Sequence, residues 1–139
     1  MGLVQPEQIA KVGSEAAEKA ALFAWAALNQ DVYPDLQYMF AVPNGEKRDK
    51  ITGARLKAQG VKRGVPDIWL PVPKKVNGSW FNEPDFYYHG IVIEMKVKNN
   101  VLSEDQNRYR EFLISKNYFY TICFTWIQAR DVIVWYLSS

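Results

Sequence analysis

The sequence contains a single cysteine and a single histidine in 139 residues. One cysteine cannot form an intramolecular disulfide, and Cys123 lies in the apolar stretch FYTICFTW, which indicates a buried, inert thiol in a reducing, intracellular setting. His89 has no histidine or cysteine partner with which to share a metal ion, so we expect no zinc site there. The sequence therefore disfavours both a disulfide framework and zinc chemistry.

Long apolar runs are also missing. No run approaches the roughly 20 residues that span a bilayer, and no basic segment followed by an apolar one opens the chain, so we expect neither membrane insertion nor classical export. The sequence shows no internal repeat, no low-complexity segment and no domain boundary. Residues 1–139 therefore predict one cytoplasmic domain, large enough for an ordinary core.

Helix and strand patterns alternate along the chain. Residues 14–30 are rich in alanine, lack glycine and proline, and begin at a suitable N-cap, Ser14, so they predict a helix. Residues 74–85 are turn-rich and predict a long hairpin loop. The alternation predicts an α/β fold, a mixed β-sheet with helices packed on both faces. The other expected helices are 46–60, 103–117 and 127–137, the last with a strand as the alternative, and the expected strands are 36–42, 64–72, 86–97 and 118–126.

Two of the expected strands carry charged residues where apolar ones are usual. Asp67 follows Pro66 at the start of one strand, and Glu94 and Lys96 lie on one side of another because strand side chains alternate. If these strands are hairpin partners, Asp67 lies across from Glu94. Two carboxylates this close require a cation between them, and Mg²⁺, with the main-chain carbonyl of Met95 as a further oxygen ligand, is the natural occupant.

The remaining members of this candidate site are less certain from the residues alone. Lys96 can orient a metal-activated water or offset charge developing on a phosphate, but it could also be a solvent-facing decoration. Glu15 or Glu18, spaced to share a helix face with Leu22 and Trp25, can supply another acidic ligand. Either glutamate fits equally well as a first-turn acid that complements the helix dipole.

Basic residues cluster just before Asp67, although the formal net charge is only +2. Such a run is commonly a solvated helix face, and two acidic residues dilute this one. Its position beside the candidate metal site favours contact with nucleic-acid phosphates, which fix position but carry no sequence information. Seven of the seventeen basic residues belong to this cluster: Lys47, Arg48, Lys50, Arg55, Lys57, Lys62 and Arg63. The two nearest Asp67, Lys62 and Arg63, are the strongest candidates for DNA contact.

The ordered motifs point to a known family. Pro66-Asp67 followed by Glu94-Met95-Lys96 resembles the PD-(D/E)xK nucleases, which have a restriction-endonuclease-like fold. More narrowly, KRGVPDIWLP, the preceding VPNG and the downstream LSEDQ are similar to the virus-type replication-repair nuclease (VRR-NUC) family, especially its short standalone phage and bacterial members. The resemblance spans nearly the whole chain, from SEAAE to the final helix.

The resemblance implies a Mg²⁺-dependent phosphodiesterase, with Mn²⁺ able to substitute, that acts on branched DNA such as four-way (Holliday) junctions. Asp67 and Glu94 would be metal ligands and Lys96 the catalytic lysine. The family's glutamine corresponds to Gln106, although the S-x-x-Q pattern that begins at Ser103 fits a helix capping box equally well. The family's helix-borne glutamate corresponds to Glu15 or Glu18.

The resemblance also bears on assembly and on location. Short standalone members are expected to be homodimers with paired active sites, in the cytoplasm of a bacterium or a phage-infected cell. Loop aromatics could form a dimer surface or stack on unpaired bases. A noncatalytic module that binds structured nucleic acid, and a flap- or nick-directed nuclease of the same fold, are the alternative functions. The aromatics in question are Trp80, Phe81, Tyr87 and Tyr88.

Overall fold

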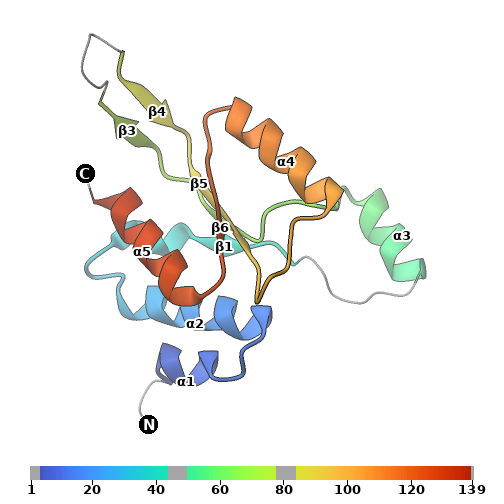
Figure 1. Ribbon diagram of the computed structural model, residues 1–139, viewed down its shortest axis with the longest axis horizontal. Coiled ribbons are helices and arrows are strands. Elements are labelled where there is room, and N and C mark those ends of the chain that lie inside the picture. Colours follow the sequence, from blue (N-terminus) through green and yellow to red (C-terminus); the bar gives the residue numbers. More distant parts are fainter. Residues whose placement is uncertain (1–3, 44–49, 78–83, 139) are drawn as a thin grey trace.

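The centre of the molecule is a mixed β-sheet, seen in a computed structural model that describes residues 4–43, 50–77 and 84–138. In these residues the sheet has four strands in the order β1-β2-β5-β6. β1, β2 and β5 pair antiparallel, whereas β5 and β6 pair parallel (Figure 1). The α/β class and the mixed sheet predicted from the sequence are confirmed. The strands are β1 (Phe40–Ala41), β2 (Ile68–Leu70), β5 (Ile91–Met95) and β6 (Phe119–Cys123).

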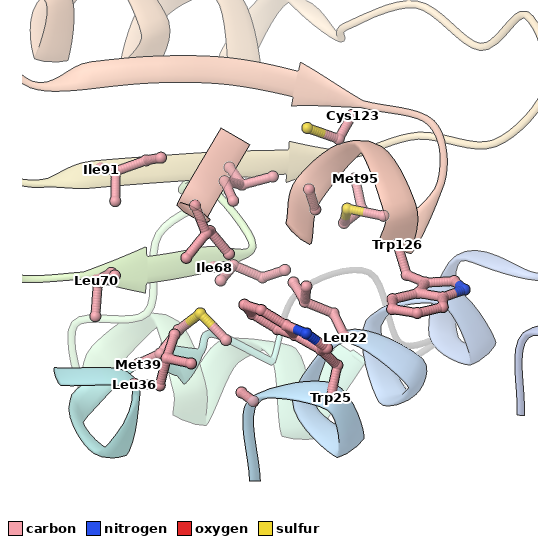
Figure 2. Close-up of a cluster of buried hydrophobic side chains, with 14 of the residues drawn as sticks. Leu22, Trp25, Leu36, Met39, Ile68, Leu70, Ile91, Met95, Cys123 and Trp126 are labelled. Atoms are coloured by element: carbon pink, nitrogen blue, oxygen red, sulfur yellow. The ribbon is translucent and has the colours of Figure 1, made fainter. Parts of the chain in front are cut away.

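Helices cover both faces of this sheet. The helices α2 (Glu15–Leu28) and α5 (Trp126–Leu137) pack on one face, where they share a buried apolar cluster with the strands (Figure 2). The helix α4 (Glu104–Ser115) lies on the other side of the strands from α5 (Figure 1). In β5, Ile91, Ile93 and Met95 belong to the apolar cluster, whereas Val92 and Glu94 do not, although all five residues are buried. The predicted alternation of this strand is therefore correct, and Glu94 faces the side of α4.

Side-chain caps explain where the main helices begin. Ser14 accepts a hydrogen bond from the Ala17 amide (3.0 Å), and Thr125 accepts one from the Gln128 amide (3.1 Å). The predicted helix at 14–30 is thus confirmed as α2, and the closing segment is helical. At the other end of α5, the buried Lys74 ammonium lies 3.5 Å from the Trp135 carbonyl and complements the helix dipole.

Three expectations need correction. The predicted strand 36–42 is only partly a strand: its first three residues belong to a 3₁₀ helix, η1 (Pro34–Tyr38), because Pro34 opens a turn that buries Leu36, and only Phe40–Ala41 form β1. The predicted strand 86–97 is two strands, β4 (Phe86–Tyr88) and β5, separated at Gly90. The turn-rich loop instead contains β3 (Lys74–Val76), which pairs with β4 in a separate sheet. A further helix, α1 (Pro6–Ala10), was not expected.

The remaining elements match expectation more closely. The predicted helix 46–60 is observed as α3 (Lys50–Ala58), while residues 46–49 lie outside the described ranges. Cys123 is buried, and this burial raises the pKa of its thiol to about 11, which keeps it in the unreactive protonated form. Within the described residues, no helix combines the length and the apolarity that a bilayer crossing needs.

Gly64 allows the segment before Asp67 to pack closely against the start of α4. Its φ of +82° is in the left-handed region, and a Cβ there would lie 2.5 Å from the Asp105 carbonyl oxygen. We expect Gly64→Ala to lower the free energy of unfolding by about 2 kcal/mol or more. Gly53→Ala is the matched control, because Gly53 is helical with open space around it and should gain up to about 1 kcal/mol. Urea unfolding measures both variants, and equal stabilities would contradict this account.

Candidate active site

The register of β2 and β5 brings the two candidate carboxylates together. Ile68 pairs with Ile93, so the next antiparallel pair is Asp67 with Glu94. Both are buried, at 5% and 2% exposure. The Met95 amide donates to Asp67 Oδ2 at 3.0 Å, which holds that carboxylate beside β5. The two strands, expected to be hairpin partners, do pair antiparallel, although β3 and β4 lie between them in the chain, and the expected juxtaposition of Asp67 and Glu94 is confirmed.

The buried carboxyl group of Glu94 has a hydrogen-bond partner for only one of its two oxygens. Its Oε1 accepts a hydrogen bond from Gln106 Nε2 at 2.9 Å, whereas its Oε2 is buried with no hydrogen-bond partner. Burial raises the pKa of Glu94 to about 8, with the charge of Asp67 adding to the rise and that of Lys96 opposing it. An unpartnered oxygen beside a second carboxylate is chemically suited to a hard divalent cation.

The described residues contain no group of three or more His, Cys, Asp or Glu side chains placed to hold a metal ion. Glu18 instead accepts a hydrogen bond from the Trp126 amide at 3.1 Å, which caps the start of α5 and links two helices. Glu15 is partly exposed on the first turn of α2. A third acidic ligand from either glutamate therefore stays a prediction, with Glu18 already engaged in this conformation.

Lys19 is a member of the site that sequence reasoning missed. Its Nζ lies 3.7 Å from Asp67 Oδ1, and its side chain is only 22% exposed. The ammonium group of α2 therefore offsets the charge of Asp67 from the side away from the Met95 amide. Nothing in the sequence distinguishes Lys19 from an ordinary solvated lysine, because its role depends on where α2 packs against the sheet.

Gln106 serves both roles that the sequence left open. Ser103 Oγ accepts from the Gln106 amide (3.2 Å), and Gln106 Oε1 accepts from the Ser103 amide (2.8 Å), so the capping box is complete. The remaining Nε2 donates to Glu94. The start of α4 is thus connected directly to the candidate metal site.

Tyr120 is a second missed residue, on the same sheet face as Glu94. Its hydroxyl is buried without a hydrogen-bond partner, and the Arg110 guanidinium lies 5.9 Å from its ring centroid. Burial raises the pKa of this phenol well above its ordinary value, and the Glu94 charge raises it further, so the group stays protonated. Only the parallel register of β5 and β6 reveals this neighbour, and sequence gives no direct signal of that register.

The basic residues near the motif are open to solvent. Lys62 and Arg63 are exposed immediately before Gly64, and Arg55 and Lys57 are exposed on α3 at the periphery of the molecule (Figure 1). Lys47 and Arg48 lie outside the described residues, as do Trp80, Phe81 and the side chain of Lys50. The described cations are thus available to an anionic partner.

Comparison with known proteins identifies the family. A family model described as the VRR-NUC domain matches residues 5–125, so the chain belongs to the VRR-NUC family of nuclease-type domains. A solved structure titled "VRR_NUC domain protein" superposes with a TM-score of 0.68 at 21% sequence identity, covering 88% of this chain and 87% of that one. At this identity the likeness shows the fold. No curated protein sequence matches the chain.

Proposed function

We propose that this nuclease domain is a Mg²⁺-dependent DNA endonuclease that hydrolyses phosphodiester bonds in branched DNA, such as four-way junctions. The observation that carries the proposal is the buried pair of Asp67 and Glu94, which face each other across β2 and β5 with Glu94 Oε2 unpartnered. A purely structural pair of this kind is costly, because either two like charges share a dry site or Glu94 must hold a proton, as its raised pKa of about 8 reflects. A divalent cation removes that cost.

The chain offers three oxygen donors to such an ion: the carboxylates of Asp67 and Glu94 and the main-chain carbonyl of Met95. This all-oxygen set suits Mg²⁺, which keeps waters in its other positions, and Mn²⁺ should substitute for it. When bound, the ion supplies Lewis-acid polarisation of a phosphoryl oxygen and lowers the pKa of a water molecule.

The residues around the pair have distinct proposed tasks. Lys96, one residue beyond the end of β5 and two positions after Glu94, orients the attacking water and offsets charge that develops on the phosphate. Gln106 fixes the orientation of the Glu94 carboxyl through its 2.9 Å hydrogen bond. Lys62 and Arg63 hold the DNA backbone near the site, with α3 extending the contact through Arg55 and Lys57.

The preference for branched DNA and a homodimer with paired active sites rest on the resemblance to short standalone members of the family. Two copies of one active site can cut two strands symmetrically, which suits a four-way junction. A noncatalytic DNA-binding module is the competing function. It does not explain why two carboxylates and a lysine converge at a dry site, since binding phosphates requires cations alone.

A panel of labelled DNAs tests the proposal: four-way junction, flap, splayed arm, nicked duplex, plain duplex and single strand, each with Mg²⁺, Mn²⁺ or EDTA. We expect metal-dependent, symmetric cuts at the junction and little cutting of plain duplex. Preferred cutting of flaps or nicks would replace the junction assignment while retaining the nuclease. Tight binding without cleavage of any substrate in either metal would leave the noncatalytic module.

Gln106 gives a prediction that separates helix capping from site organisation. Gln106→Ala and Ser103→Ala each break the capping box and should each lower stability by about 1 kcal/mol. Only Gln106→Ala removes the donor to Glu94, so it alone should lower the cleavage rate, by about 10- to 100-fold. Thermal unfolding and single-turnover cleavage measure the two effects. Equal loss of cleavage in both variants would assign Gln106 to capping only.

A further inference from the structure

A pocket of about 530 Å³ opens beside Lys96, on the sheet face that α4 covers. Its wall is formed by Ile122 of β6, by Lys96 and Phe124 just beyond the ends of β5 and β6, by the loop 100–102 and by α4. The Lys96 amide donates to the Cys123 carbonyl at 3.0 Å, so Phe124 follows directly alongside Lys96. Ile122, which also lines the pocket, pairs with Glu94 in the parallel register. The pocket is therefore continuous with the face that carries the candidate active site.

The lining combines two kinds of chemistry. Cationic and amide groups come from Lys96, Arg110, Asn100 and Asn107. An apolar surface comes from β6 and its exit, where Phe124 is 40% exposed. Cations suit a phosphate, amides suit the polar edge of a base, and an open aromatic ring suits the face of a base. A groove that bound only the phosphate backbone would not need an exposed aromatic ring such as that of Phe124.

We infer that this pocket binds one unpaired nucleotide of the DNA strand next to the bond that is cut, with its base against Phe124 and its phosphate near Arg110. Its volume lies within the range of about 300–1,000 Å³ usual for small-ligand sites. A base inside a duplex reaches such a pocket only after unstacking, which costs a few kcal/mol, whereas an unpaired base avoids that cost. The inference rests on the proposed function: flaps and splayed arms carry such a base, whereas in a four-way junction, whose bases can all pair, a base pair beside the cut must first open.

The test measures binding without cleavage, with Ca²⁺ in place of Mg²⁺. Two duplexes carry the same five-nucleotide gap, one with normal nucleotides and one with abasic sites, so that their phosphates are equal in number. By fluorescence anisotropy we expect the wild-type protein to bind the base-bearing gap about tenfold more tightly, because one stacked base contributes that much or more. Equal affinity for the two gaps would overturn the inference.

Variants assign the effect to the pocket. Phe124→Leu keeps an apolar side chain and should reduce the preference to less than about threefold. Phe112→Leu, which alters an exposed ring on α4 that does not line the pocket, should leave the preference unchanged. Arg110→Gln should weaken binding of both gaps alike and lower the salt slope by about one, whereas Arg108→Gln should not. A preference that survives Phe124→Leu, or an Arg110→Gln variant that binds both gaps like wild type, would contradict the assignment.

The two proposals can fail separately. Base preference in the binding assay with no cleavage of any DNA would retain the pocket and remove the nuclease. Metal-dependent cleavage with equal binding of the two gaps would retain the nuclease and remove the pocket.

Discussion

Lys96→Ala is expected to lower the single-turnover cleavage rate by about 10²- to 10³-fold while leaving DNA affinity within about threefold of wild type. Lys96 is partly buried beside Glu94, and its charge acts on that carboxyl. It therefore offers a positive charge where charge develops during phosphoryl transfer, which the bound ground state does not need. Single-turnover kinetics, measured with enzyme in saturating excess over DNA, isolates the chemical step.

Lys75→Ala is the matched control for this variant. Lys75 is an exposed lysine on β3 whose ammonium group lies 3.3 Å from the Asp85 carboxylate. It comes after β2 in the chain, whereas Asp67 lies just before that strand. We expect wild-type cleavage from it and at most a small loss of stability. Full activity of Lys96→Ala, or an equal loss in both variants, would remove Lys96 from the chemistry.

The second large effect is the pH dependence of the metal-free protein. The pKa of Glu94 is about 8 in the folded protein, against 4.5 for a glutamate in the unfolded chain, so the folded protein binds the proton more tightly. The contribution of Glu94 to stability is therefore fully present below about pH 4.5 and is lost as the pH rises through about 8. Glu94→Gln lacks this loss and should be more stable than wild type at pH 8.5 by about 2 kcal/mol.

Mg²⁺ should reverse this trend, because the ion binds the ionised carboxyl and must displace a proton. Below about pH 8 the affinity for Mg²⁺ should rise up to tenfold per pH unit and then level off. Calorimetry in buffers of different ionisation enthalpy measures the proton released. A wild-type protein whose stability relative to Glu94→Gln does not change between pH 5 and 8.5, and whose Mg²⁺ binding releases no proton, would contradict the assigned environment of Glu94.

Much of the site could be predicted because it is encoded in local pattern. Asp67 after Pro66 and the interrupted apolar run around Glu94 are anomalies that a strand tolerates only for a reason. Alternation predicted Glu94 and Lys96 on one face, although β5 ends at Met95, one residue before Lys96, and the capping pattern located the start of α4 beside Gln106. Each of these signals spans only a few residues of sequence.

The features that were missed depend on long-range packing. Lys19 reaches Asp67 only because α2 lies against the sheet, and Tyr120 approaches Glu94 only through the register of β5 with β6. The error in the first half of the predicted strand 36–42 has a different cause. Leu36 and Met39 are three residues apart and both buried, which suits a 3₁₀ turn, but in a short apolar run this spacing is easily read as part of a strand.

The central claim is that Asp67 and Glu94 together hold a divalent metal ion. Anomalous diffraction from crystals grown with Mn²⁺ tests it most directly, with Glu94→Gln crystals grown under the same conditions for comparison. The account predicts one strong anomalous peak coordinated by both carboxylates in the wild-type protein and its loss or marked weakening in the variant. At saturating Mn²⁺, a wild-type site without a peak between these two side chains, or a peak unchanged in Glu94→Gln, would contradict the claim.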